Sequence, residues 1–335
     1  MSRTIALTNE NTPYASLEPA LILDAIESTG LRCSGSLFAL NSYENRVYQV
    51  GIEEDNPLIA KFYRPHRWSN AAILEEHQFS SELLKREIPV VAPLAILAEQ
   101  TLYEYQGYRF AVFPRQGGRT LELDNLDHLE WIGRFIGRLH AVGTCQPFKH
   151  RLTLDAQSYG AIPYEFLSQN NFIPEELRLH YQQTMTIILQ QIALIFQKIG
   201  PIRSIRLHGD CHAGNILWRD TGPQIVDLDD CLMGPAIQDL WMLLSGDTEA
   251  EKNLQLSTLL DGYQEFYDFN FREVQLIEVF RTLRMIHYSA WLARRWEDPT
   301  FPLHFPWFNT PHYWHEQWEH LQDQIALLEQ SALNL

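Results

Sequence analysis

Two neighbouring segments constrain this chain more than any other feature: LHGDCHAGNILW at 207–218 and IVDLDD at 225–230. The first segment carries Asp210 and Asn215, separated by four residues, and the second places Asp227 at the end of a short apolar strand. Taken singly, HGD is a commonplace turn and D-x-D is common in an acidic protein. A purely structural turn does not require the two segments in this order and at this distance, so the combination points to a functional site.

This arrangement is typical of phosphoryl transfer. An Asp followed by four residues and then Asn has the spacing of a kinase catalytic loop. In that chemistry a carboxylate orients the acceptor hydroxyl and takes its proton, while oxygen ligands hold magnesium against the phosphates. Asp210 suits the first role, and Asn215 and Asp227 supply the hard oxygen ligands that Mg²⁺ prefers. We therefore predict Asp210 and Asp227 as catalytic residues, Asn215 and Asp227 as metal ligands, and ATP with Mg²⁺ as co-substrate and cofactor.

The residues around the predicted base have further interpretations. His208 and His212 flank Asp210, and Cys211 between them does not complete a convincing zinc site. We expect His208 to pack under the loop as a hydrogen-bonding residue, and His212 to lie near the phosphates or the substrate. Asp229 has two equal alternatives: it ligates a second metal, or it caps the following loop.

A lysine inside a predicted strand indicates the nucleotide side of the site. Lys61 lies within the apolar run 58–63, where burying an unpaired ammonium is costly. Kinases use such a lysine to hold the α- and β-phosphates, with a glutamate of the following helix as its partner. Glu75 and Glu76 both fall in a helix predicted at 70–86. A lysine that only reaches toward solvent is the alternative.

The periodicity of the chain divides it into a β-rich part and a helical part. Strand-like runs at 46–50, 58–63, 89–93, 102–105 and 108–113 surround one helix at 70–86. Helical spacing predicts a helix at 272–296 and two apolar helix faces, which comprise Leu129, Ile132, Ile136 and Leu139, and Tyr181, Met185, Ile188, Ile192, Ile195 and Ile199. The predicted fold class is α+β, with a small β-rich N-lobe at 1–112, a connector at 113–119 and a larger helical C-lobe at 120–335.

Composition and charge narrow the classes of partner. Lysine and arginine number 26 against 42 aspartates and glutamates, a net charge of −16, which disfavours nucleic acid as a partner. There is no run of about 18 apolar residues for a membrane span, and residues 1–11 lack the pattern of a secretory signal. Four scattered cysteines without a CxxC fit reduced thiols. We expect a cytoplasmic protein with no membrane partner.

A family resemblance extends along nearly the whole chain. The stretches that carry it are 40–49, 60–64, 74–79, 110–114, 207–218, 226–230, 234–236, 238–244 and 305–307. The loop at 207–218 resembles the Brenner-type motif of the aminoglycoside phosphotransferase and choline kinase group, and the whole set resembles the bacterial stress response kinase A family. The resemblance implies a protein kinase-like (aminoglycoside phosphotransferase-like) fold of two lobes. It also implies a monomeric, cytoplasmic, ATP- and Mg²⁺-dependent Ser/Thr protein kinase of the stress response.

The resemblance also assigns roles to single residues. It selects Glu76, immediately before His77, as the partner of Lys61, and Asp239 as the residue that anchors the catalytic loop through backbone hydrogen bonds. The turn at 41–46 stands where a glycine-rich loop is expected, and the resemblance implies that Ser42 contacts a phosphate there, unless this turn serves structure alone. Backbone groups of 111–114 are expected to meet the adenine. The segment 226–230 lacks the glycine of a DFG motif, which puts a eukaryotic type of activation switch in doubt.

Two C-terminal features have alternatives of their own. The C-terminal part is rich in aromatic side chains, which form either part of the core or a substrate cleft. They are Trp291, Trp296, Phe301, Phe305, Trp307, Phe308, Tyr313, Trp314 and Trp318. Four arginines form a solvated helix face or a surface for a phosphorylated or acidic substrate: Arg281, Arg284, Arg294 and Arg295.

Three functions follow from these observations. The first is a Ser/Thr protein kinase, which the whole-chain resemblance favours. The second is a small-molecule kinase acting on an alcohol group of an amino alcohol, sugar or aminoglycoside, since both use the same transfer chemistry. The third is a non-catalytic nucleotide-binding regulator, which predicts the loss of at least one of four residues that are all present: Lys61, Asp210, Asn215 and Asp227.

Overall fold

The computed structural model describes residues 12–333. The segment 1–11, on which the prediction of no secretory signal rests, lies outside the described residues. The chain divides into two compact units. We call residues 12–122, 149–151 and 213–230 the sheet unit, and residues 123–148, 152–212 and 231–333 the helical unit. The predicted connector at 113–119 stays a prediction. The grouping of 149–151 and 213–230 with the N-terminal sheet is a feature that the sequence analysis did not contain.

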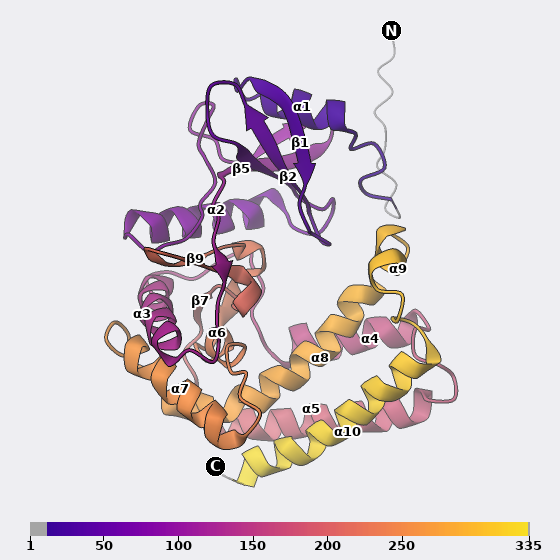
Figure 1. The fold of residues 1–335 in the computed structure, drawn as a ribbon. Coiled ribbons are helices and arrows are strands. Elements are labelled where there is room, and N and C mark those ends of the chain that lie inside the picture. Colours follow the sequence, from indigo (N-terminus) through magenta and orange to yellow (C-terminus); the bar gives the residue numbers. More distant parts are fainter. Residues whose placement is uncertain (1–11, 334–335) are drawn as a thin grey trace. The chain divides into compact units, whose positions relative to one another are not determined.

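The sheet unit is built on a five-stranded antiparallel sheet of order β1-β2-β3-β5-β4 (Figure 1). Its elements are α1 (Pro19–Glu27), β1 (Cys33–Ala39), β2 (Arg46–Ile52), β3 (Leu58–Phe62), α2 (Asn70–Lys85), β4 (Tyr103–Tyr105) and β5 (Tyr108–Pro114). The predicted strands at 46–50, 58–63, 102–105 and 108–113 are therefore confirmed, as is the helix at 70–86. The turn between β4 and β5 has positive φ at Gln106 and Gly107, as a tight hairpin requires. Helix α1 and strand β1 were not predicted; β1 is mostly exposed and irregular in register.

Helix α1 packs on one face of this sheet and helix α2 on the other. Phe62 and Phe110 belong to the core that includes α1, whereas Ala111 packs with Ile73 of α2. Successive side chains of a strand point to opposite faces. Lys61, which precedes Phe62 and pairs with Ala111 in the β3–β5 register, therefore lies on the α2 face.

A second, smaller sheet of the sheet unit carries two of the predicted site residues. It consists of β6 (Arg119–Thr120), β8 (Ile216–Arg219) and β9 (Gly222–Ile225) in the order β6-β8-β9, with the short helices η2 (Ala213–Asn215) and η3 (Leu228–Asp230) beside it. The predicted strand at 89–93 is wrong. It forms only an isolated bridge between Val90 and Ile225, because its two prolines cannot donate to a sheet ladder.

The helical unit consists of helices and one two-stranded sheet, β7 with β10. Its elements are α3 (Leu126–Gly143), η1 (Gln157–Ala161), α4 (Ile162–Gln169), α5 (Arg178–Ile199), β7 (Ile205–Leu207), β10 (Leu232–Gly234), α6 (Gln238–Trp241), α7 (Glu249–Tyr263), η4 (Phe271–Leu276), α8 (Ile277–Ala293), α9 (Thr300–His304) and α10 (Pro311–Leu333). The two predicted apolar faces lie on α3 and α5 and are buried, which confirms both helices. The helix predicted at 272–296 begins as the 3₁₀ turn η4 and continues as α8.

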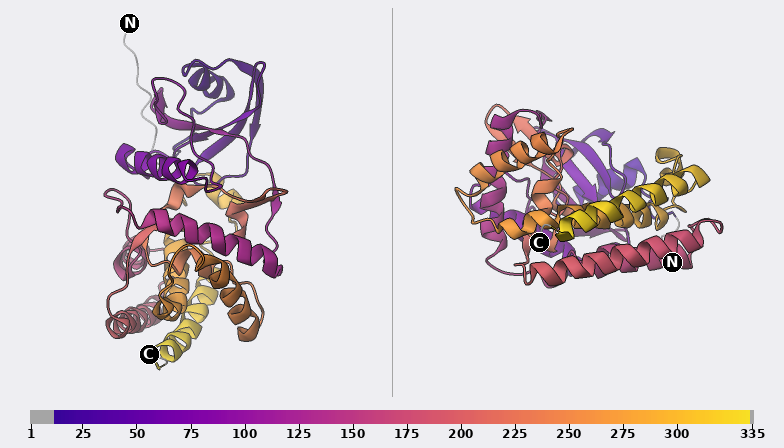
Figure 2. Two further views of the ribbon diagram at one scale, coloured as in Figure 1. Left: turned by 90° about the vertical axis from the view of Figure 1, so that its left-hand side faces the viewer. Right: turned by 90° about the horizontal axis from the view of Figure 1, so that it is seen from below.

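Two close helix pairs organise this unit. Helices α5 and α10 run side by side along their length (Figure 2). Helices α3 and α7 approach so closely that a Cβ at Gly133 would lie 2.0 Å from the Leu259 carbonyl oxygen. Among residues 12–333, no helix is long and apolar enough to cross a membrane.

The C-terminal aromatic residues form part of the core. Phe301, Phe308 and Trp314 are each about 1% exposed, and the ring centroids of Phe308 and Trp314 lie 5.9 Å apart. Trp307, 45% exposed, lies at the edge of this cluster. The packing supports the core interpretation of these side chains.

Candidate active site

Lys61 is buried on the α2 face of the sheet among three carboxylates. Its Nζ lies 3.3 Å from Glu76 Oε1, 3.2 Å from Asp227 Oδ1 and 3.0 Å from Asp229 Oδ1. Burial alone would lower the pKa of Lys61, but the carboxylates of Asp229, Glu76 and Asp227 raise it well above its ordinary value. Lys61 is therefore a fixed positive charge at neutral pH. The predicted pair with Glu76 is present, and the alternative of a solvent-reaching lysine is wrong.

The two adjacent glutamates of α2 have different partners. The second carboxylate oxygen of Glu76 lies 3.0 Å from Nη2 of Arg151, whose side chain is fully buried. The carboxylate of Glu75 instead accepts the backbone N–H groups of 149–151, at 2.6, 2.8 and 3.2 Å. Glu76 thus holds the lysine, and Glu75 fastens the short segment 149–151 to the sheet unit.

Asp229 has a role that neither sequence interpretation contained. It is only 2% exposed and forms ion pairs with both Lys61 and Arg67. Burial alone would raise the pKa of Asp229, but Lys61, Arg67 and Arg151 hold it well below its usual range. Nη1 of Arg151 also donates to the Asp229 carbonyl oxygen at 2.5 Å. Asp229 is therefore a permanently ionised partner of the buried cations.

Asn215 and Asp227 lie at the same end of the β8–β9 hairpin. The Val226 N–H donates to the Asn215 carbonyl oxygen at 3.0 Å, which extends the pairing beyond Ile216 and Ile225. Asp227 has a φ of +59°, an uncommon left-handed conformation for a non-glycine residue. Its side chain is 55% exposed, against 4% for Glu76 and 3% for Asp229.

The donor set at this hairpin fits magnesium in one particular way. The described residues include no group of three or more His, Cys, Asp or Glu side chains that could hold a metal ion. Magnesium usually keeps several waters and takes one or two protein carboxylates together with substrate phosphates. Asn215 and the exposed carboxylate of Asp227 match that pattern, because the remaining ligands come from water and from the phosphates of a nucleotide.

The turn at 41–46 is closed by its own side chains. The Val47 N–H donates to Ser42 Oγ at 3.2 Å, and Asn45 Oδ1 accepts the Arg64 N–H at 3.1 Å. Arg46 donates to the Tyr43 carbonyl oxygen at 3.3 Å. These side chains stabilise the turn in place of glycines. A phosphate contact of Ser42 stays a prediction.

In the helical unit, Asp239 anchors the loop that carries Asp210. Asp239 is fully buried and accepts the His208 N–H at 2.7 Å and the Gly209 N–H at 2.8 Å. His140 Nε2 lies 3.1 Å from the same carboxylate. His208 is also fully buried, and its Nδ1 accepts the Asp210 N–H at 3.3 Å. The loop-anchoring role predicted for Asp239 and the packing predicted for His208 are both confirmed.

Both carboxylate oxygens of Asp210 contact nitrogen donors. Oδ1 lies 2.7 Å from Arg284 Nη1, and Oδ2 lies 3.4 Å from His212 Nε2. Burial alone would raise the pKa of Asp210, but His212 and Arg284 hold it well below its usual range. Asp210 is therefore ionised at neutral pH. The contact joins residues 74 positions apart, and nothing in the local sequence distinguishes Arg284 from Arg281, Arg294 and Arg295.

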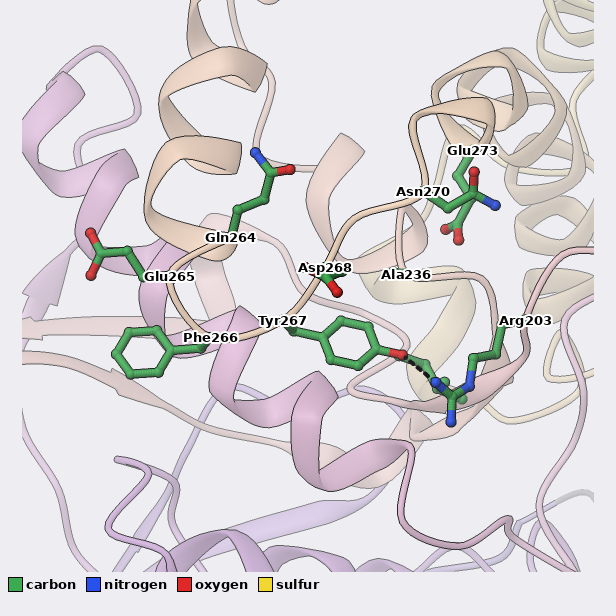
Figure 3. A pocket seen from close by; sticks show the side chains of 10 residues that line it. Arg203, Ala236, Gln264, Glu265, Phe266, Tyr267, Asp268, Asn270 and Glu273 are labelled. Atoms are coloured by element: carbon green, nitrogen blue, oxygen red, sulfur yellow. Dashed lines mark hydrogen bonds between the residues drawn. The ribbon is translucent and has the colours of Figure 1, made fainter.

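A cavity of about 470 Å³ lies elsewhere in the helical unit (Figure 3). Arg203, Tyr267 and Glu273 are among its lining residues, and Arg203 Nη1 donates to the Tyr267 hydroxyl at 3.2 Å. Glu273 is 3% exposed, and its carboxylate accepts the Ile237 N–H at 3.1 Å. Burial raises the pKa of Glu273 to about 7. No motif or periodicity in the sequence points to this carboxylate.

Comparisons with known proteins point to phosphotransferases. The model of the phosphotransferase enzyme family (APH) matches residues 38–277. Stress response kinase A of Escherichia coli (strain K12) is 44% identical over 329 residues, which cover 98% of this chain and 99% of the relative. Serine/threonine protein kinase RdoA of Salmonella typhimurium is 44% identical over 328 residues, 98% of each chain.

A solved structure extends the comparison to the fold. The amicoumacin kinase hAmiN, in complex with AMP-PNP, Ca²⁺ and Ami, is similar with a TM-score of 0.64 and 21% identity. The match covers 87% of this chain and 95% of hAmiN. The antiparallel N-terminal sheet and the helical C-terminal part therefore have the fold of the aminoglycoside phosphotransferase and choline kinase type, as predicted.

Proposed function

The chain belongs to the phosphotransferase enzyme family and, within it, to the stress response kinase A family, and from this premise we propose that it transfers the γ-phosphate of ATP to serine and threonine hydroxyls of proteins in a stress response. The observation that carries the proposal is the buried ammonium of Lys61, held between Glu76 and Asp227. A lysine held by a helix glutamate and next to a metal-binding aspartate is the arrangement that kinases use on nucleotide phosphates.

On the nucleotide side, Lys61 supplies a fixed positive charge for the α- and β-phosphates. Asn215 and Asp227 would hold the magnesium ion, which, when bound, neutralises charge on the phosphates. Asp227 is the carboxylate suited to this role, because Glu76 and Asp229 are buried and engaged with cations while Asp227 is 55% exposed. Ser42 would donate to a phosphate oxygen from the turn that its own side chain helps to close.

On the acceptor side, Asp210 serves as the base. The acceptor oxygen bonds to the γ-phosphorus, the bond from that phosphorus to the oxygen of the departing ADP breaks, and the hydroxyl proton passes to Asp210. The carboxylate is ionised at neutral pH and can accept this hydrogen bond. Asp239 fixes the loop that presents it by binding two successive backbone N–H groups.

The family resemblance also supports a cytoplasmic monomer. A net charge of −16 disfavours nucleic acid as a partner. ATP and a protein hydroxyl are the partners that the proposal requires.

Transfer from γ-labelled ATP tests the proposal. Purified protein is incubated with labelled ATP and Mg²⁺, with generic protein substrates in one tube and a panel of amino alcohols, sugars and aminoglycosides in another. Label on serine or threonine, of a substrate protein or of the kinase itself, supports a protein kinase. Label confined to a small molecule would instead establish the second candidate, a small-molecule kinase.

Variants connect the result to the site. Asp210→Asn and Asp227→Asn are expected to reduce transfer by at least a thousandfold while the circular dichroism spectrum stays unchanged. Asp220→Asn, in the exposed turn between β8 and β9, is the matched control and should leave transfer unchanged. Comparable turnover by the Asp210 variant and the wild type would overturn the base assignment.

A further inference from the structure

Helix α8 presents a stripe of cationic and aromatic side chains that are half-buried or exposed. Arg281, Arg284, Tyr288 and Trp291 follow one another at intervals of three, four and three residues, and Arg295 follows four residues later. Residues at this spacing share one face of a helix, since a helix turns every 3.6 residues. Residues between them on α8, such as Leu283, Ile286 and Ser289, are buried. We call these five residues the α8 stripe; the helix that carries most of them is labelled in Figure 1.

The stripe contacts the proposed base directly. Arg284 Nη1 lies 2.7 Å from Asp210 Oδ1, and the two side chains are 41% and 25% exposed. A guanidinium carries five N–H donors in a planar fork that matches a carboxylate. With 41% of its side chain accessible, Arg284 can therefore bind a carboxylate from outside the chain as well as the one from Asp210.

This contact affects the chemistry proposed for Asp210. An acceptor hydroxyl needs a lone pair on the carboxylate, and an arginine bound to the same oxygen makes that oxygen a weaker acceptor. A second carboxylate close to the acceptor hydroxyl would compete for Arg284 and loosen its hold on Oδ1. A negative charge on the substrate would therefore free Asp210 from Arg284.

The remaining members of the stripe fit the same partner. Arg281 is 31% exposed and pairs with Glu278 at 3.2 Å, whereas Arg284 is 41% exposed, so Arg284 presents the larger part of its side chain to a partner. The rings of Tyr288 and Trp291 are stacked, with centroids 5.6 Å apart, and the guanidinium of Arg295 lies 5.2 Å from the Trp291 centroid. A chain with a net charge of −16 repels an acidic partner in general, so local cations of this kind are what would bring one to the base.

We propose that Arg284 is a specificity-determining residue that selects acidic protein acceptors, binding an aspartate or glutamate close to the phosphorylated serine or threonine. Arg281 binds a second acidic side chain of the same segment, and the ring of Tyr288, which is 39% exposed, contacts its apolar atoms. The inference rests on the proposed protein kinase function and adds the class of acceptor sequence to it.

Matched peptides test this selection. Each peptide carries one serine and either Asp or Asn at a single position from three residues before the serine to three after it. For the wild type, kcat/KM is expected to favour the Asp member by about tenfold at one position or more, which is the size of one charge-assisted hydrogen bond. The preference should appear in KM, because Arg284 binds the acidic side chain, and in kcat, because that binding loosens Arg284 from Asp210, and it should shrink as salt screens the charges.

Variants assign the preference to Arg284. Arg284→Gln should bring the Asp/Asn ratio close to one, and Arg284→Lys should retain part of it. Arg178→Gln, at an exposed arginine that begins α5, is the matched control and should keep the wild-type ratio. The readout is the ratio between two peptides on one enzyme, so a general loss of activity in the Arg284 variants does not affect it.

The outcomes separate the inference from the function on which it rests. Peptides that are phosphorylated with no preference for Asp at any position would overturn the selection and leave the protein kinase standing. An Asp preference that persists in Arg284→Gln would also overturn the role of Arg284. If neither peptides nor proteins take up label while a small alcohol does, the proposed function fails and the inference fails with it.

Discussion

Nη2 of Arg151 lies 3.0 Å from Oε2 of Glu76, while Lys61 Nζ lies 3.3 Å from Oε1 of the same carboxylate. Two buried cations therefore hold Glu76 from opposite sides. Arg151 also donates to the backbone carbonyl oxygens of Ala72 in α2 and of Asp229 in η3, at 2.8 and 2.5 Å. The pair of Lys61 with Glu76 is thereby fixed by a third residue that lies 75 positions further along the chain.

Replacing Arg151 should destabilise the fold strongly. Arg151→Met keeps much of the side-chain volume but removes the donor to Oε2 of Glu76, which Lys61 then holds through Oε1 alone, and the donor to the carbonyl oxygens of Ala72 and Asp229. Removing one partner of a buried ion pair costs about 3–5 kcal/mol. Urea unfolding measures the difference, with the exposed Arg178→Met as control, expected within about 0.5 kcal/mol of wild type. A change below about 1 kcal/mol for Arg151→Met would contradict this account of the network.

Substitutions of the two adjacent glutamates of α2 should have different effects: one mainly on activity, the other mainly on stability. Glu76→Gln removes one of the three negative charges around Lys61, the one that comes from α2, so kcat/KM for ATP is expected to fall by about tenfold or more. Glu75→Gln weakens only the hydrogen bonds to the backbone of 149–151 and should lower the free energy of unfolding by about 1 kcal/mol. Steady-state kinetics and urea unfolding of the two variants check both parts. Equal kinetic defects would show that the assignment of Glu76 as the partner of Lys61 is wrong.

Sequence reasoning was most successful where one local pattern determines position. Period-two alternation places Lys61 on a defined face of β3, and the helix at 70–86 offered only two candidates for its partner. The order of Asp210, Asn215 and Asp227 along the chain is visible in the sequence itself. Their proposed roles in binding and catalysis remain predictions.

Contacts between distant segments could not be predicted in this way. No periodicity relates Arg151 to Glu76 or Arg284 to Asp210, because each pair meets only after helices and strands have packed. Asp229 was open to two interpretations because neither the burial of its side chain nor the position of Arg67 is visible in the sequence. The false strand at 89–93 has a local cause: its apolar residues fit a strand, while its prolines prevent a ladder.

The anchoring carboxylate of Asp239 should matter for turnover more than for nucleotide binding. Asp239→Asn leaves one oxygen to accept two N–H groups and turns an NH₂ toward one of them. The loop that carries Asp210 should then lose its fixed position, and kcat is expected to fall by about a hundredfold, as small displacements of catalytic groups do. The apparent KM for ATP should change less than threefold. A wild-type kcat for this variant would show that the loop holds its position without the carboxylate.

Glu273 should make the stability of the protein depend on pH in a defined window. Its pKa is about 7 in the folded protein against an ordinary value of 4.5, so the folded state binds this proton more tightly than the unfolded state does. The stabilisation from that proton is fully present below about pH 4.5 and is lost as pH rises through 7. Over this window the loss is about 3 kcal/mol at most.

The variant Glu273→Gln tests this dependence, because its side chain carries no titrating proton. The free energy of unfolding of the variant, minus that of the wild type, should therefore increase from pH 5.5 to pH 8. Urea unfolding at the two pH values measures it. A difference that stays constant with pH would mean that the Glu273 carboxyl titrates alike in the folded and unfolded chains.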